Sequence, residues 1–140
     1  MTSLVLINLA ISCYLLGLIF TIQVVHYPSF IYADRNLFHK FHLFHVKRIS
    51  LIVMIPMLAE LLAAGALAFI SPSTMTLFLL SLVLLIWLST AFLSVPRHNK
   101  LATSKNPRLI SELTLTNWPR TILWSARVGI LFYLSLSALT

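Results

Sequence analysis

Carboxylate side chains are scarce in this chain, and so are charges of either sign. Asp34, Glu60 and Glu112 are its only acidic residues, and charged residues make up 9% of its 140 residues. Hydrophobic residues account for 59%, and the mean hydropathy is +0.96. A soluble domain of this size has too high a surface-to-volume ratio to bury so much apolar surface. The composition therefore predicts an integral membrane protein, with lipid as the solvent for much of its side-chain surface.

Cysteine is nearly absent as well. The single cysteine, Cys13, lies inside an apolar stretch, which excludes an internal disulfide and a C-x-x-C metal or redox motif. We expect its thiol to be buried and to pack as a small hydrophobe. The first Lys or Arg is Arg35, so the first apolar stretch lacks the basic region of a cleaved signal peptide. No nucleotide-binding loop, hydrolase triad signature or zinc-finger spacing occurs, which sets those function classes aside.

Four apolar stretches are long enough to cross a bilayer as helices, which takes about 20 residues each. They cover about residues 3–26, 49–70, 75–95 and 119–139. A tight turn at residues 71–74 joins the second stretch to the third, whereas residues 27–48 and 96–118 form longer, polar connections. We expect a short amphipathic helix over about residues 34–47 to lie along the membrane interface. The predicted fold is all-α: a single domain of residues 1–140 that forms a four-helix transmembrane bundle.

The basic residues all lie in the two longer connections or in the helix ends beside them. They are Arg35, Lys40, Lys47, Arg48, Arg97, Lys100, Lys105, Arg108, Arg120 and Arg127. Because Lys and Arg are retained on the cytoplasmic side of membranes, this pattern predicts cytoplasmic connections and non-cytoplasmic termini. Together with the four apolar stretches, it also predicts a multi-pass membrane protein. The net charge of +7 predicts contact with anionic lipid headgroups and not with nucleic acid.

A polar stripe runs along one face of each predicted helix, because residues three or four positions apart share a face. The stripes are Asn8, Ser12, Ile19, Gln23 and His26; Pro56, Met57 and Glu60; Trp87, Ala91, Ser94 and His98; and Asn117, Arg120, Trp124, Arg127 and Ser135. Glu60 and Arg127 reach similar depths from the same side, and a charge at the bilayer centre is costly unless paired. An ion pair between them would either fix the packing of two helices or line a ligand cavity. The sequence also allows them not to meet.

Five histidines gather toward the cytoplasmic end: His26, His39, His42, His45 and His98. Neutral imidazole is the commonest metal ligand, and helix bundles build metal or haem sites from several helices. His26, His42, His45 and His98 are therefore candidate ligands of a metal ion or haem. They are equally candidates for hydrogen bonds to an organic ligand, or for ordinary residues of the interface. His39, next to Lys40, is expected to be solvated.

The start of the fourth predicted helix places further polar groups at this end. Asn117, Arg120 and Arg127 share a face that could hold an anionic or quinone-like group, and Trp118 and Trp124 suit an interfacial aromatic belt. The predicted pocket comprises Gln23, His26, Glu60, Asn117, Arg120, Trp124 and Arg127, together with the candidate metal ligands. The leading hypothesis is a site for a metal, haem or quinone-like ligand, with redox or oxygenase chemistry as its reaction.

A second hypothesis belongs to a different class: a non-catalytic accessory or assembly subunit of a larger membrane complex, or a homo-oligomer. The small size and the short non-cytoplasmic loops suit that role, and lipid-facing aromatics such as Phe78 and Phe132 would then carry the contacts. A transporter or channel is less favoured, because four helices leave little room for a pore.

Several segments together resemble a family of small, four-span bacterial membrane proteins of uncharacterised function. They are residues 23–28 (QVVHYP), 41–49 (FHLFHVKRI), 56–60 (PMLAE), 95–98 (VPRH) and 117–121 (NWPRT), with Trp124 and Arg127. This resemblance implies a multi-pass protein of the bacterial inner membrane. The four-span layout is more distantly similar to the anthrone-oxygenase-like group of membrane proteins. That similarity implies oxygenation or redox chemistry on a hydrophobic aromatic substrate.

Overall fold

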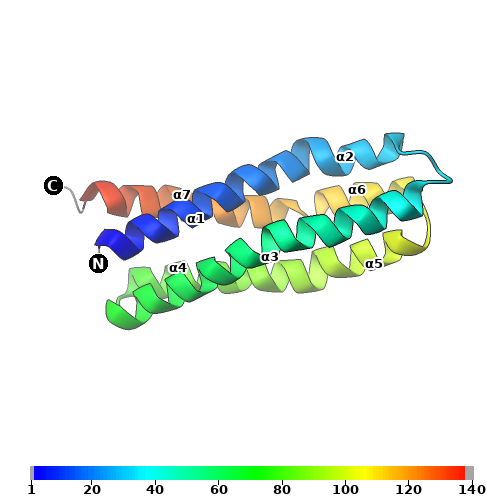
Figure 1. Cartoon of the computed structure of the whole chain (residues 1–140). Coiled ribbons are helices and arrows are strands. Elements are labelled where there is room, and N and C mark those ends of the chain that lie inside the picture. The colour runs from blue at the N-terminus through cyan, green and yellow to red at the C-terminus, as the bar shows by residue number, and fades with distance from the viewer. Residues whose placement is uncertain (1, 138–140) are drawn as a thin grey trace.

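Four antiparallel helical segments form a single elongated bundle (Figure 1). The computed structural model describes residues 2–137, and this part of the chain contains helices and no strand. We call the segments bundle helices 1 to 4. Helix 1 comprises α1 (Thr2–Thr21), η1 (Ile22–His26), α2 (Tyr27–Ser29) and η2 (Phe30–Tyr32), and helix 2 is α3 (Phe38–Ile70). Helix 3 comprises α4 (Thr74–Ser89), η3 (Thr90–Ser94) and α5 (Val95–Thr103), and helix 4 comprises α6 (Pro107–Leu115) and α7 (Trp118–Ser137).

The first three bundle helices confirm the prediction of a membrane protein. The helical runs Thr2–Tyr32, Phe38–Ile70 and Thr74–Leu101 are each long and apolar enough to cross a bilayer. The two ends of the described chain and the short turn between α3 and α4 lie at one end of the bundle (Figure 1). The α7 helix is also 20 residues long, but Arg120 and Arg127 lower its mean hydropathy.

The prediction of a separate interfacial helix over residues 34–47 is wrong. Helix α3 instead runs without a break for 33 residues from Phe38 to Ile70. Residues 38–55 contain neither Pro nor Gly, and Phe38, His42 and His45 are buried at helical spacing against the bundle. At 1.5 Å per residue, α3 is about 50 Å long, well beyond the hydrocarbon core of about 30 Å. The bundle therefore continues past the hydrocarbon core at its basic end, where α5 and α6 occupy the other predicted connection.

Bundle helices 1 and 3 each contain a single π-helical turn directly before a proline. The turns are η1, followed by Tyr27 and Pro28, and η3, followed by Val95 and Pro96. Their wider hydrogen bonds run from the Tyr27 N–H to the Ile22 carbonyl and from the Val95 N–H to the Thr90 carbonyl. A proline ring clashes with the carbonyl four residues earlier, and a wider turn relieves that clash. A π turn contains one residue more than an α turn, and this extra residue rotates the part of the helix after the turn relative to the part before it.

The predicted stripes of helices 1, 2 and 4 are largely buried, whereas in the stripe of helix 3 only Ser94 is buried and Ala91 is exposed, because the π turn η3 shifts the buried face there. Two expectations for single residues also differ from the structure. All five stripe residues of helix 4 are buried: Asn117, Arg120, Trp124, Arg127 and Ser135. Cys13 is exposed and not buried as predicted, because it follows the inward-facing Ser12 by one position and points about 100° away from it. Trp124 is completely buried and so does not belong to an aromatic belt, whereas Trp118 is exposed.

Candidate functional site

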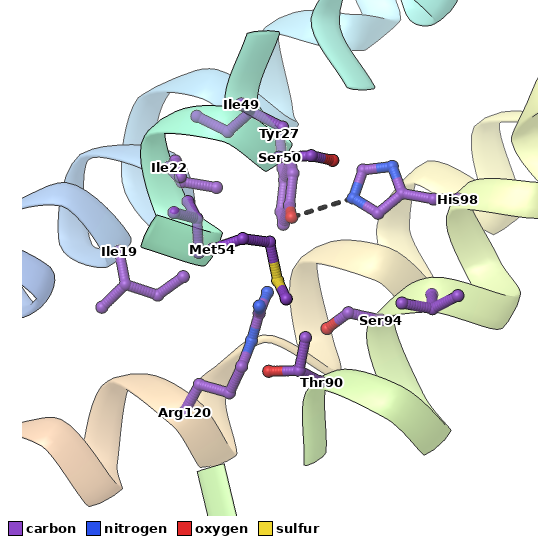
Figure 2. Close-up of a pocket in the computed structure, with 12 residues that line it drawn as sticks. Ile19, Ile22, Tyr27, Ile49, Ser50, Met54, Thr90, Ser94, His98 and Arg120 are labelled. Carbon is purple, nitrogen blue, oxygen red and sulfur yellow. Dashed lines mark hydrogen bonds between the residues drawn. The ribbon is translucent and has the colours of Figure 1, made fainter. Parts of the chain in front are cut away.

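A pocket opens on the side of the bundle between α3 and the η3–α5 segment (Figure 2). Three large polar side chains meet in it: Tyr27 from helix 1, His98 from helix 3 and Arg120 from helix 4. The Tyr27 hydroxyl lies 3.0 Å from Nε2 of His98, and the Arg120 side chain points from α7 into the pocket (Figure 2). Arg120 is only 4% exposed, and its Nε finds no hydrogen-bond partner among residues 2–137. The pocket therefore has a buried cationic floor with an N–H group free to donate.

The remaining walls of this pocket are mainly aliphatic. Ile19, Ile22, Ile49, Val53, Met54 and Val95 line it, together with the hydroxyls of Ser50, Thr90 and Ser94. Its volume is about 100 Å³, which is the share of about three water molecules in the liquid. A site of this size admits a small ring or a short polar head, and any longer apolar tail must leave through the mouth. Met54 and Val95 are exposed on the outer surface, so the mouth opens on the side of the bundle.

The position of Arg120 is set by a chain of amide groups that joins helices 1 and 4. The Asn117 side chain accepts a short hydrogen bond from Nη2 of Arg120 and donates to Oε1 of Gln23 at 2.7 Å. The Gln23 amide in turn donates to the Thr114 carbonyl at 2.9 Å. Gln23 and Asn117 are both buried. These two predicted site residues thus lie behind the pocket and orient Arg120.

Four of the five histidines form one cluster above the pocket. His26 Nε2 lies 2.7 Å from Nδ1 of His45, and His42 Nε2 lies 3.3 Å from Nδ1 of His98. The rings of His45 and His98 are 5.7 Å apart between centroids, and Phe30 packs edge-on against His26, His42 and His45. His39 is exposed, as expected, and lies 2.7 Å from the Ala102 carbonyl. The sequence-based grouping of these four residues agrees with their positions.

The described residues give no further support to a metal site at this cluster. Across residues 2–137, no group of three or more His, Cys, Asp or Glu side chains is placed to hold a metal ion. One nitrogen of each ring in the His26–His45 pair, Nε2 of His26 and Nδ1 of His45, is already in hydrogen-bonding contact with the other. Two ring nitrogens, Nδ1 of His42 and Nε2 of His45, are buried with no hydrogen-bond partner in the described chain. Metal or haem ligation by these histidines stays a prediction.

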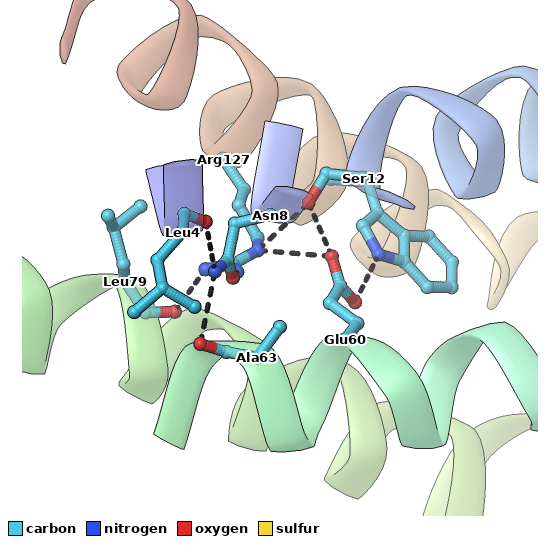
Figure 3. A network of polar contacts seen from close by, with 8 residues as sticks. Leu4, Asn8, Ser12, Glu60, Ala63, Leu79 and Arg127 are labelled. Atoms are coloured by element: carbon cyan, nitrogen blue, oxygen red, sulfur yellow. Dashed lines mark hydrogen bonds and ion pairs between the residues drawn. The ribbon is translucent and has the colours of Figure 1, made fainter. Parts of the chain in front are cut away.

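Glu60 and Arg127 form a second polar group, nearer the other end of the bundle (Figure 3). Nε of Arg127 lies 3.0 Å from Oε1 of Glu60, and the two side chains are 0% and 1% exposed. Arg127 also donates to the hydroxyl of Ser12 at 3.1 Å, to the Leu79 carbonyl at 2.7 Å and to the amide oxygen of Asn8 at 2.5 Å. Glu60 accepts further hydrogen bonds from Ser12 at 2.6 Å and from the Trp124 indole at 3.0 Å.

These contacts make the Glu60–Arg127 pair a closed network that joins all four bundle helices. Its residues come from α1, α3, α4 and α7, and within residues 2–137 none of their buried polar atoms lacks a partner. A buried charge needs this degree of compensation, because its desolvation penalty is large. Of the alternatives that the sequence left open, the arrangement favours packing. Glu60, Trp124 and Arg127 lie outside the pocket that Arg120 lines.

Sequence reasoning missed Tyr27, whose hydroxyl lies beside His98 at the pocket wall. In a regular helix His26 would follow Asn8, Ser12 and Gln23 on the buried face. The π turn η1 shifts that face by one residue, so Tyr27 is buried and His26 is only partly buried. The signal for this shift is Pro28, whose ring disfavours a regular turn before it.

Comparison of the chain with known protein families, with curated proteins and with solved structures found no match.

Proposed function

We propose that this protein binds a small, membrane-dissolved, quinone-like ligand in the pocket between α3 and the η3–α5 segment. The observation that carries the proposal is the buried Arg120 with its unpartnered Nε at the floor of a mainly aliphatic pocket. A buried donor without a partner costs about 1–3 kcal/mol, and a carbonyl oxygen of a bound ligand would remove that cost. Polar groups that converge in an otherwise apolar concavity are typical of ligand sites.

The paired Tyr27 and His98 give the ligand a second polar contact. The Tyr27 hydroxyl and the His98 ring already share a hydrogen bond of 3.0 Å at the pocket wall. A ligand oxygen beside them would accept from Tyr27, and the imidazole can take up or release a proton through the same bond. The proposed function is therefore binding, with Tyr27 and His98 able to exchange a proton with the bound oxygen.

A binding experiment can test this with one pair of matched variants. Val53 lines the pocket, whereas Leu51, two positions earlier on α3, is 59% exposed and lies outside it. The variant Val53→Phe should fill the pocket and abolish binding of a short-chain benzoquinone to the protein purified in mild detergent. Leu51→Phe should bind as the unmodified protein does. Binding is measured as the ligand-induced rise in melting temperature, since a ligand at 100 times its Kd stabilises by about 2.7 kcal/mol. Equal binding by both variants would refute the site.

The proposed topology has four membrane spans, with both termini on the non-cytoplasmic side of a bacterial inner membrane. Two observations support α7 as the fourth span: Arg120 and Arg127 are buried inside the bundle, and Ile122, Phe132, Tyr133 and Leu136 are exposed on its outer surface. The concentration of Lys and Arg at the other end supports the orientation. Alkaline phosphatase fused after Thr140 should be active in a bacterial host, and a fusion within residues 104–106 should be inactive. The opposite result would invert the topology.

A second candidate function is that of an accessory subunit, supported by the aromatic side chains on the outer surface. Phe78, Phe92 and Phe132 are all exposed there. If these side chains contact a partner protein, the double variant Phe78→Leu, Phe132→Leu should lose that partner during purification. The variant Val53→Phe should keep it. If the unmodified protein and the double variant both purify from mild detergent without a partner, this second candidate is contradicted.

A further inference from the structure

A second groove lies on the other flank of α3, between that helix and bundle helix 1. Leu18, Thr21, Ile22 and His26 form one wall, and Phe41, Phe44, His45, Arg48, Ile49 and Ile52 form the other. The groove has a volume of about 300 Å³ and contains mostly apolar side chains. Ile22 and Ile49 line both this groove and the Arg120 pocket, so they form the partition between the two.

The groove runs along the bundle axis and not across it. Its α3 wall extends from Phe41 to Ile52, which is about 16 Å at 1.5 Å per residue. Helix 1 is antiparallel to α3, so that Leu18 lies beside the Ile52 end and His26 beside the Phe41 end. The Ile52 end therefore points toward the bilayer centre, and the Phe41 end, with His26 and His45, lies toward the basic end of the bundle. Arg48 lies between these ends, about 6 Å along α3 from Ile52. An extended hydrocarbon chain fits this shape.

Arg48, within the α3 wall of this groove, has no anionic partner among residues 2–137. Its guanidinium lies 5.5 Å above the Phe44 ring, and Lys47 is its neighbour in sequence. The three carboxylate side chains are all engaged elsewhere: Asp34 accepts from the backbone N–H groups of Asn36 and Leu37, Glu60 pairs with Arg127, and Glu112 pairs with Arg108. The positive charge of Arg48 is therefore available to pair with an anion from outside the chain.

His45 supplies an independent indication of a ligand. It lines the groove, is only 5% exposed, and its Nε2 has no hydrogen-bond partner among the described residues. If His26 Nε2 donates to His45 Nδ1, the other nitrogen of His45 carries the ring proton and needs an acceptor. Phosphate and ester oxygens are such acceptors, and Arg is well suited to phosphate.

We propose that this groove between bundle helix 1 and α3 binds one anionic phospholipid. One acyl chain lies along the groove, and the phosphate is held at Arg48 and His45. This site is distinct from the quinone-like ligand pocket and does not depend on it.

The test is a competition between two lipids with identical acyl chains, phosphatidylglycerol and phosphatidylcholine, offered together to the whole protein in mild detergent. Bound lipid is counted by native mass spectrometry. We expect one phosphatidylglycerol per chain in preference to phosphatidylcholine, and a loss of that preference by about tenfold in Arg48→Gln, as for removal of one charge-assisted contact. The control Lys100→Gln removes the same charge from an exposed position outside the groove and should keep the preference.

A second pair of variants tests the acyl end. Ile52→Trp should fill the groove and release both lipids, while Ile55→Trp, at an exposed position one turn further along α3, should retain them. Arg48, Ile52 and Ile55 are all exposed, so these variants are expected to fold. The proposal is overturned if the unmodified protein binds both lipids equally, if Lys100→Gln and Arg48→Gln lose the preference equally, or if Ile52→Trp retains as much lipid as Ile55→Trp.

Discussion

Replacing Glu60 with Gln changes one charge at the centre of the buried network while keeping the size of the side chain. The carbonyl oxygen of Gln can still accept from Arg127 and Ser12, which now donate to Oε1 of Glu60. Its amide NH₂ group, however, would face the Trp124 indole N–H, which donates to Oε2 at 3.0 Å. Two donors would then oppose each other, and Arg127 would lose its only carboxylate partner among residues 2–137.

The expected cost is large because the Arg127 side chain is completely buried. Removing one partner of a buried ion pair costs about 3–5 kcal/mol, since the remaining charge is left uncompensated. An unpaired Trp124 N–H alone would cost about 1–3 kcal/mol. The two costs are not additive because both arise in one network. We therefore expect Glu60→Gln to lower the free energy of unfolding by about 3–5 kcal/mol.

The chain offers the same substitution at an exposed position as a control. Glu112 pairs with Arg108 one turn away at 3.1 Å, but these side chains are 40% and 86% exposed. Glu112→Gln should cost no more than about 0.5 kcal/mol. Unfolding in mixed micelles with increasing dodecyl sulfate, followed by circular dichroism and by tryptophan fluorescence, measures both variants. A loss below about 1 kcal/mol for Glu60→Gln, or one equal to that of Glu112→Gln, would refute the reasoning about buried pairs.

Three further predictions concern the pocket and the histidines. Asn117→Ala removes the acceptor that holds Arg120, so the Kd of the benzoquinone should rise by about tenfold with unchanged helical content, as judged by titration and circular dichroism; an unchanged Kd would contradict the positioning role. Ile49→Ala removes the partition between the two cavities, so the protein should accept a bulkier naphthoquinone and lose about 1–3 kcal/mol of stability; a mutant that still excludes the larger ring would disprove the partition. Treatment with a chelator should leave the melting temperature unchanged, given the geometry of the histidine cluster; stoichiometric iron or copper that is lost in His42→Ala and His98→Ala would instead establish the metal interpretation.

The features that depend on hydropathy and helical periodicity could be predicted from the sequence. The apolar stretches identified the first three membrane-crossing helices. The 100° rotation per residue placed Asn117, Arg120, Trp124 and Arg127 on one buried face. Depth arithmetic, applied to Glu60 and Arg127, brought together two residues that are in contact. These predictions succeeded because they assume only that each helix is straight and regular and that the bilayer is flat.

The remaining features depend on where the helices depart from straight, regular geometry or continue beyond the apolar stretches. Hydropathy marks where a helix is apolar and not where it ends, so the basic continuations of α3 and of helix 3 were predicted as connections. Periodicity assumes 3.6 residues per turn, so it placed His26 and not Tyr27 on the buried face. The spacing also does not distinguish Arg120, which lines a pocket, from Arg127, which is enclosed in a network.

The π turn η1 has a consequence for insertions and deletions. Helix 1 carries Asn8 and Ser12 against the Glu60–Arg127 network, and it carries Tyr27 against His98 in the pocket. Both sets of contacts are satisfied at once only because one additional residue lies between them. Deleting Val24 or Val25, which are exposed, would turn one half of the helix by about 100° against the other. Substitutions at these two positions should therefore be tolerated, whereas deletion of either residue should not. The number of residues in η1, and not their chemistry, fixes the alignment of the network with the pocket.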